Sequence, residues 1–290
     1  IAQVGKSFRN EVTPRNFIFR SREFEQMEME FFCPPEDAKK WYDFWVQTRR
    51  DWWESLGINP EKLITREHAE DELAHYSTAC ADVEYKYSFT EPEYGELEGI
   101  SHRGDYDLAQ HQEHAGVKME YFDQERNERY IPHVIEPAAG LTRGVMVLLE
   151  EAYREEWVPK GDTDGEIQEA VPGEAVPEGY ETRTVLRFHP RLAPTKVAVF
   201  PLLKNKPDLV AKAREVYNLL RKRHAIFWDA TGAIGRRYRR QDEIGTPFGV
   251  TIDFDSLDDN TVTLRDRDTM SQRRVSIEEL VQILDEKING

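Results

Sequence analysis

Two runs near the start of the chain decide the expected fold: Phe8-Arg9-Asn10-Glu11, and residues 20–31, which read R-S-R-E-F-E-Q-M-E-M-E-F. Between Phe17 and Phe32, aromatic residues and methionines alternate with arginines and glutamates. This alternation is typical of a β-strand with one charged face. Residues 12–16, V-T-P-R-N, carry the proline and asparagine that favour a turn. The sequence therefore predicts an antiparallel hairpin, joined at residues 12–16, whose charged face carries Arg9, Glu11, Arg20, Arg22, Glu23 and Glu28.

The charged face of this hairpin suits a nucleoside triphosphate. Guanidinium groups match phosphate oxygens, carboxylates accept hydrogen bonds from an adenine amine or an ammonium group, and Phe24 offers a ring on which a base can stack. An ordinary hairpin with a solvated charged face is the alternative interpretation. The segments F-R-N-E, T-P-R-N, F-R-S-R-E-F and E-Q-M-E follow one another as in motif 2 of class II aminoacyl-tRNA synthetases. The chain resembles this family, and specifically its dimeric glycyl-tRNA synthetases.

Length and cysteine content set further limits. The 290 residues are enough for a substantial core and two domains. The two cysteines, Cys33 and Cys80, are too few for a disulfide framework or an all-cysteine zinc site, so we expect a reducing, cytoplasmic compartment; a lone disulfide between them is the alternative. No apolar run is long enough for a membrane span and no signal peptide is visible. Because the chain begins inside a motif and without Met, we interpret it as a fragment.

The charge is unevenly distributed along the chain. The formal net charge is -16, but residues 193–290 carry 17 Lys+Arg against 15 Asp+Glu, whereas residues 1–192 carry 22 against 40. Four arginines, Arg236, Arg237, Arg239 and Arg240, surround Tyr238 in the nearly balanced part. We expect a local basic patch that contacts tRNA. The alternative is a strand face paired with Asp242, Glu243 and neighbouring acids.

Three regions follow from the pattern of residues. Residues 1–157 mix strands with helices expected at 36–56 and 143–157. Residues 158–182 are rich in Gly, Pro and Glu, and are expected to form a mobile linker or insertion. Residues 183–290 alternate strands (197–202, 225–228, 250–254 and 261–266) with helices (207–222 and 276–287), which indicates a small α/β sheet. Ser276 and Glu279 form a capping box at the start of the last helix.

The resemblance continues beyond the hairpin. Residues 95–108, G-E-L-E-G-I-S-H-R-G-D-Y-D-L, resemble the family's G-E-L-E-G-I-A-D-R segment, and residues 134–143, V-I-E-P-A-A-G-L-T-R, resemble motif 3. Ala138 and Thr142 stand where the family often has Ser and Asp. Residues 193–202 and 232–248 resemble the anticodon-binding domain. The resemblance implies an α+β antiparallel class II catalytic core followed by an α/β anticodon-binding domain.

The resemblance also implies the activity and the residues that perform it. The expected reaction is ATP-dependent activation of glycine and transfer to tRNA(Gly) by a homodimer, with Mg2+ held in part by Glu96. Arg9 and Arg143 are the expected catalytic residues, and Glu28 and Arg103 are expected to bind the ammonium and carboxylate of glycine, with Glu30 and Glu72 adding negative potential. The expected ATP contacts are Arg9, Asn10, Glu11, Phe19, Arg20, Ser21, Arg22, Glu23, Phe24, Glu96, Leu97, Gly140, Leu141, Thr142 and Arg143. The expected glycine contacts are Phe24, Glu25, Gln26, Met27, Glu28, Arg103, Glu136, Pro137, Ala138, Ala139 and Gly140.

Two other functions are compatible with the sequence. A catalytically inactive nucleic-acid-binding protein on the same scaffold is one alternative, and a class II synthetase for another amino acid is a second. His102, His111 and His114 lie close in sequence, but this spacing without cysteines is not specific for a metal. We therefore expect no zinc.

Overall fold

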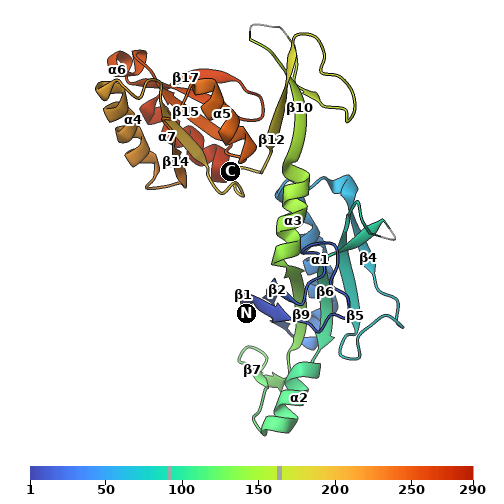
Figure 1. Cartoon of the computed structure of the whole chain (residues 1–290). Helices are drawn as coiled ribbons and strands as arrows, with labels where there is room; N and C mark the ends of the chain where they lie inside the picture. Colours follow the sequence, from blue (N-terminus) through green and yellow to red (C-terminus); the bar gives the residue numbers. More distant parts are fainter. Residues whose placement is uncertain (91–92, 162–164, 290) are drawn as a thin grey trace. The chain divides into compact units, whose positions relative to one another are not determined.

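The computed structural model describes residues 1–90, 93–161 and 165–289, which fold as two compact units, residues 1–148 and 149–290 (Figure 1). We expected the first domain to end at residue 157. The division between the compact units falls within helix α3 (Leu141–Ala152). Within the described ranges, none of the helices is long and apolar enough to cross a membrane.

The first unit is built on a seven-stranded antiparallel sheet with the order β1-β2-β9-β6-β5-β4, in which β3 also pairs with β9. Its strands are β1 (Ala2–Phe8), β2 (Glu23–Met29), β3 (Phe31–Cys33), β4 (Leu63–Glu67), β5 (Ala79–Lys86), β6 (Tyr94–Gly104) and β9 (His133–Gly140). The remaining elements are η1 (Pro35–Asp37), α1 (Ala38–Ser55), η2 (Pro60–Lys62), α2 (Tyr106–Ala115), β7 (Tyr121–Asp123) and β8 (Glu128–Tyr130). The antiparallel sheet and the helix expected at 36–56 are confirmed.

Helix α1 packs on one face of this sheet, against β6 and β9. Glu98 of β6 is almost fully buried there; its carboxylate accepts hydrogen bonds from Arg49 Nε and Trp53 Nε1, both at 2.6 Å. The two donors come from α1, so this buried ion pair attaches the helix to the sheet. Because α1 covers this face, the functional side chains of the sheet must lie on the other one.

The predicted hairpin forms, but its turn is longer than expected. β1 ends at Phe8 and β2 begins at Glu23, so residues 9–22 form a loop, with an isolated bridge between Arg15 and Arg20. The expectation of a strand from residue 17 was wrong. Asn16 and Phe17 have left-handed backbone with φ of 57° and 55°, which interrupts an extended chain.

The prediction that the helix starting at residue 143 continues to residue 157 was also wrong. α3 ends at Ala152, and the chain continues as β10 (Tyr153–Pro159), the central strand of a three-stranded sheet with β11 (Gln168–Glu169) and β12 (Tyr180–Leu186). β10 buries Trp157 and Val158 in this sheet, which favours a strand over further helix. The region expected as a linker, 158–182, therefore contributes strand residues at both ends; its residues 162–164 lie outside the described ranges.

The second unit contains a five-stranded sheet with the order β14-β13-β15-β16-β17. Its strands are β13 (Val197–Pro201), β14 (Ile226–Trp228), β15 (Phe248–Ile252), β16 (Thr261–Asp266) and β17 (Gln272–Ser276), and its helices are α4 (Pro207–Leu220), α5 (Ile234–Glu243), α6 (Asp255–Asp259) and α7 (Ile277–Asn289). The core lies between this sheet and helices α4 and α7. The capping box is confirmed, because the Glu279 N–H donates to Ser276 Oγ at 3.1 Å and Ser276 Oγ donates to Glu279 Oε2 at 2.9 Å. β15 begins two residues earlier than expected, and β17 and α5 were not expected.

Candidate active site

The loop of residues 9–22 lies over the uncovered face of the first sheet and borders a small cleft, with an enclosed volume of about 90 Å³. The residues that line it come from this loop, β2, β6, β9 and the start of α3: Arg9, Glu11, Ile18, Phe19, Arg20, Ser21, Phe24, Gln26, Glu96, Ala138, Gly140, Thr142 and Arg143. Three segments that are far apart in the sequence, and that were each assigned to ATP or glycine, therefore meet in one place.

Arg143 connects the three segments. Its guanidinium lies 4.3 Å from the Phe19 ring centroid and donates to the Phe19 carbonyl at 3.2 Å. It also donates to the backbone carbonyl of Glu96 and lies 3.4 Å from the Glu96 carboxylate. Phe19 in turn packs edge-on against Tyr87 and Phe89. The arginine side chain is thus held in place before any ligand binds.

A second group of contacts orders the other wall of the cleft. The Arg9 guanidinium lies 5.2 Å from the Phe24 ring centroid, and Arg22 Nε donates to the Glu11 carbonyl at 2.9 Å. Arg20 lies 3.4 Å from the Glu11 carboxylate, a long ion pair on a half-exposed surface. Two cationic side chains, Arg9 and Arg143, and an aromatic ring therefore border the same space, which suits an anionic ligand that carries a flat ring.

A polar pocket lies beside the cleft on the same face of the sheet. The carboxylates of Glu28, Glu30 and Glu136 come within 4.8 Å of one another. Arg103 makes an ion pair with Glu136 at 2.7 Å and two hydrogen bonds to Asp107, at 2.6 and 3.0 Å. Burial, partly opposed by Arg103 and reinforced by Glu30 and Glu28, raises the pKa of Glu136 to about 7.

Two residues expected in this pocket, Arg103 and Glu72, already have partners within the protein. All three guanidinium nitrogens of Arg103 already contact Glu136 or Asp107, and the guanidinium also stacks 4.1 Å from the Tyr76 ring centroid. Arg103 therefore holds Glu136 in place, and its expected role with the carboxylate of glycine stays a prediction. Glu72, expected to add negative potential, is instead paired with Arg66 at 3.1 Å.

Several residues expected in the site point to the opposite face of the sheet, because successive strand side chains alternate between faces. Gln26 and Glu28 face the site, so Met27 between them faces α1, together with the buried Pro137 and Ala139. Leu97 is likewise buried in the core. The side chains of Leu97, Pro137 and Ala139 are therefore corrected to core positions, whereas Met27 is half-buried and lines a second pocket beside α1.

Other expected contacts lie near the cleft without lining it: Asn10, Arg22, Glu23, Glu25 and Leu141. Glu23 forms an ion pair with Lys6 on the exposed hairpin. Their roles toward a ligand stay predictions.

The four arginines of the second unit lie on helix α5, not on a strand. Arg237 is only 2% exposed and donates to the Pro201 carbonyl at 2.6 Å and the Gly232 carbonyl at 2.7 Å. Its expected role in contacting tRNA is corrected to a structural one, because its guanidinium is not accessible. Arg240 pairs with Asp229 at 2.6 Å and Arg239 with Glu181, whereas Arg236 is exposed.

The acid expected to neutralise this cluster has other partners. Asp242 is buried and binds Arg183 at 3.1 Å and Arg265 at 2.8 Å. The alternative interpretation, a strand face paired with Asp242, Glu243 and neighbouring acids, was therefore wrong about the strand and about Asp242. Two of the arginines, Arg239 and Arg240, are nevertheless paired with acids, Glu181 and Asp229.

The three histidines noted in the sequence do not come together. His102 contacts His133 at 3.2 Å and Thr78 at 2.8 Å, and burial lowers its pKa. His111 and His114 lie on the exposed side of α2. The two cysteines are both free.

Comparisons with known proteins agree with this geometry. Residues 1–152 match the family model of the tRNA synthetase class II core domain (G, H, P, S and T), and residues 196–287 match that of the anticodon binding domain. The chain therefore belongs to the class II tRNA synthetases. It is 51% identical over all 290 residues to the glycine–tRNA ligases of Nocardia farcinica and Thermobifida fusca, and 50% identical to that of Cutibacterium acnes. The chain spans 58–59% of the length of these relatives.

Proposed function

We propose that the protein activates glycine with ATP and transfers it to tRNA(Gly). The observation that carries the proposal is the meeting of Arg9, Phe24 and Arg143 in one cleft, directly beside the carboxylates of Glu28 and Glu136. The similarity to glycine–tRNA ligases over the whole chain supports it.

Activation joins the carboxylate of glycine to the α-phosphorus of ATP and releases pyrophosphate. This step needs no nucleophile from the enzyme, so catalysis depends on positioning and on neutralising the phosphate charge. Arg9 and Arg143 supply positive charge on two sides of the cleft, and Phe24 offers a ring for adenine. Because contacts with Phe19 and Glu96 hold Arg143 before binding, little reorganisation is needed.

The residues of the cleft also suit a magnesium ion bound with ATP. Glu96 is half exposed in the cleft, and a hard cation prefers carboxylate and phosphate oxygens. When bound, Mg2+ would neutralise phosphate charge. Glu96 is the residue that would hold it.

Glycine recognition is assigned to the three-carboxylate pocket. An ammonium group offers three donors and one positive charge, which matches Glu28, Glu30 and Glu136. Arg103 is assigned the role of positioning Glu136. Rejection of larger amino acids would come from crowding around the Cα atom.

Pyrophosphate exchange tests the proposal. Incorporation of labelled pyrophosphate into ATP should require glycine and should not occur with alanine or serine. Equal exchange with alanine or serine would contradict the glycine assignment. A chain that exchanges pyrophosphate with no amino acid, and that binds neither ATP nor glycine in calorimetry, would instead agree with the inactive binding protein.

Binding of tRNA is assigned to the exposed side of α5, where Arg236 and Arg239 remain accessible. Arg236→Glu should weaken tRNA(Gly) binding and flatten its dependence on salt, because each lost phosphate contact removes about one released counterion. Arg129→Glu, an exposed arginine of β8, is the control. If filter binding gave Arg236→Glu and the unchanged protein the same tRNA affinity and the same dependence of affinity on salt, Arg236 would not be part of the RNA-binding surface.

A further inference from the structure

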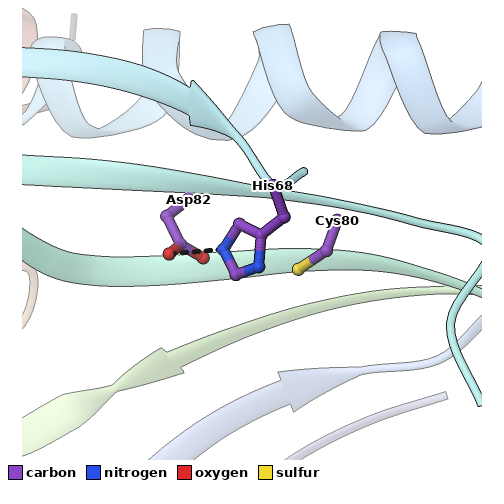
Figure 2. Close-up of side chains that lie close together, drawn as sticks. All are labelled: His68, Cys80 and Asp82. Carbon is purple, nitrogen blue, oxygen red and sulfur yellow. Dashed lines mark hydrogen bonds and ion pairs between the residues drawn. The ribbon is translucent and has the colours of Figure 1, made fainter. Parts of the chain in front are cut away.

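Three side chains with metal-binding chemistry lie together on the first sheet, outside the cleft: His68, Cys80 and Asp82 (Figure 2). One ligand atom from each lies within 4.8 Å of the other two. Cys80 and Asp82 are separated by one residue on β5, so their side chains leave the same face of the sheet. His68 directly follows β4, and its N–H donates to the Cys80 carbonyl at 2.9 Å. The backbone pairing of two strands therefore sets the positions of all three.

The side chains point toward one another, with the imidazole ring between the carboxylate and the thiol (Figure 2). His68 Nε2 lies 2.8 Å from Asp82 Oδ2. Ser101 Oγ donates to Cys80 Sγ at 3.3 Å, so the sulfur is already held from β6. One nitrogen, one sulfur and one oxygen donor therefore lie within 4.8 Å of one another.

Carboxylates outnumber the guanidinium that contacts this group. Arg66 is a positive charge that contacts it: its guanidinium lies 2.8 Å from Glu84, 3.1 Å from Glu72, 3.4 Å from Asp82 and 3.5 Å from His68 Nε2. One guanidinium is thus shared by three carboxylates, and Asp82 receives the longest of these contacts. Asp82 is also buried, and a buried carboxylate is costly unless its charge is matched.

We propose that His68, Cys80 and Asp82 form a binding site for Zn2+ or a chemically similar divalent transition-metal ion, with a fourth position open to water. Nitrogen, thiolate and carboxylate ligands are those of zinc, whereas Mg2+ avoids sulfur. Around a tetrahedral zinc ion, bond lengths of about 2.0 Å to N and about 2.3 Å to S place neighbouring ligand atoms about 3.3 to 3.6 Å apart. Binding therefore requires the His68 and Asp82 side chains to rotate, because His68 Nε2 and Asp82 Oδ2 are now only 2.8 Å apart. On binding, the Cys80 thiol releases its proton to solvent and the thiolate takes the metal in its place.

This site goes beyond the proposed function, because it uses none of the residues that line the cleft. It was not expected from the sequence, since His68 lies twelve residues before the nearest other ligand, Cys80, and no known zinc spacing is present. Its place in the fold is nevertheless close to the cleft. In sheet register, Asp82 pairs with Gly99, and Gly99 pairs with Ala138, which lines the cleft. A bound ion would cross-link β4 to β5 on the face of the sheet that carries the active site.

Cobalt titration of the metal-free 290-residue chain tests the site. One Co2+ per chain should bind with a thiolate-to-cobalt charge-transfer band in the near ultraviolet, and Zn2+ should remove that band. Cys80→Ser should abolish the band, whereas Cys33→Ser, which changes the other free cysteine, should leave it intact. His68→Asn and Asp82→Asn should each weaken Co2+ binding by about tenfold or more.

Two results would overturn the proposal: Co2+ binding without the charge-transfer band, or a band that persists in Cys80→Ser. Circular dichroism of each metal-free variant checks that it folds. If Cys80→Ser does not fold, X-ray absorption at the zinc edge of the unchanged protein decides the matter. One sulfur and two or three nitrogen or oxygen neighbours would support the site, and a shell without sulfur would refute it.

Discussion

Protonation of one glutamate is expected to control glycine binding near neutral pH. Glu136 lies among Arg103, Glu28, Glu30 and Asp107, and burial together with the neighbouring carboxylates raises its pKa to about 7, although Arg103 opposes the shift. The shift is upward, so the folded protein holds the Glu136 proton up to about pH 7. A ligand ammonium needs the ionised carboxylate. Glycine affinity should therefore rise as the pH increases through 7.

The size of the effect follows from the pKa. With a pKa of about 7, the ionised fraction of Glu136 falls from about nine-tenths at pH 8 to about one-tenth at pH 6. The KM for glycine should therefore be about tenfold higher at pH 6 than at pH 8 if binding requires the carboxylate. In Glu136→Gln the KM should be high and nearly independent of pH, because the charge and the titration are both removed.

Glycine-dependent pyrophosphate exchange at several pH values, with ATP saturating, measures this KM. Glu113→Gln, an exposed glutamate on α2, is the control and should keep the full pH dependence. Glu30→Gln is a second test, because burial also raises the pKa of Glu30. The assignment to Glu136 would be refuted if the KM for glycine did not change with pH in the unchanged protein. It would also be refuted if the pH dependence of this KM persisted in Glu136→Gln and disappeared in Glu30→Gln.

Three further changes test other parts of the structure. Arg143→Ala should slow adenylate formation by on the order of a hundredfold, since a preorganised charge is lost; a normal single-turnover rate would remove it from the site. Ala138→Ser adds a hydroxyl next to Glu28 in sheet register, and one net hydrogen bond of about 1 kcal/mol should lower the glycine KM about fivefold; an unchanged KM would show that the hydroxyl does not reach glycine. Glu98→Gln should lower the free energy of unfolding by about 3 kcal/mol, because it breaks a buried ion pair with Arg49. Urea unfolding checks this last change, and a loss below about 0.5 kcal/mol, the range of ordinary surface substitutions, would contradict it.

Much of the candidate site could be predicted because its residues lie in short contiguous runs. Arg9, Phe24 and Arg143 each belong to a motif that is recognisable without the fold, and each lines the same cleft. The capping box of α7 and strand β16 depend on local residues only, and both form where expected. The loop between β1 and β2 could not be predicted at its full length, because the left-handed backbone of Asn16 and Phe17 leaves no mark in the alternation of polar and apolar residues.

The sequence by itself determined the class of the protein, the motif residues and the elements whose signals are local. Tertiary structure decided which of these residues line the cleft. Alternation shows that Met27 and Glu28 point to opposite faces, but only the packing of α1 shows which face is covered. Packing likewise buries Arg237, whose guanidinium binds backbone carbonyls, whereas Arg236 is exposed, although the two are neighbours in one run of arginines. Pairing of β4 with β5 brought His68 to Cys80 and Asp82 across eleven residues. Such contacts depend on strand register between distant segments, which no local pattern specifies.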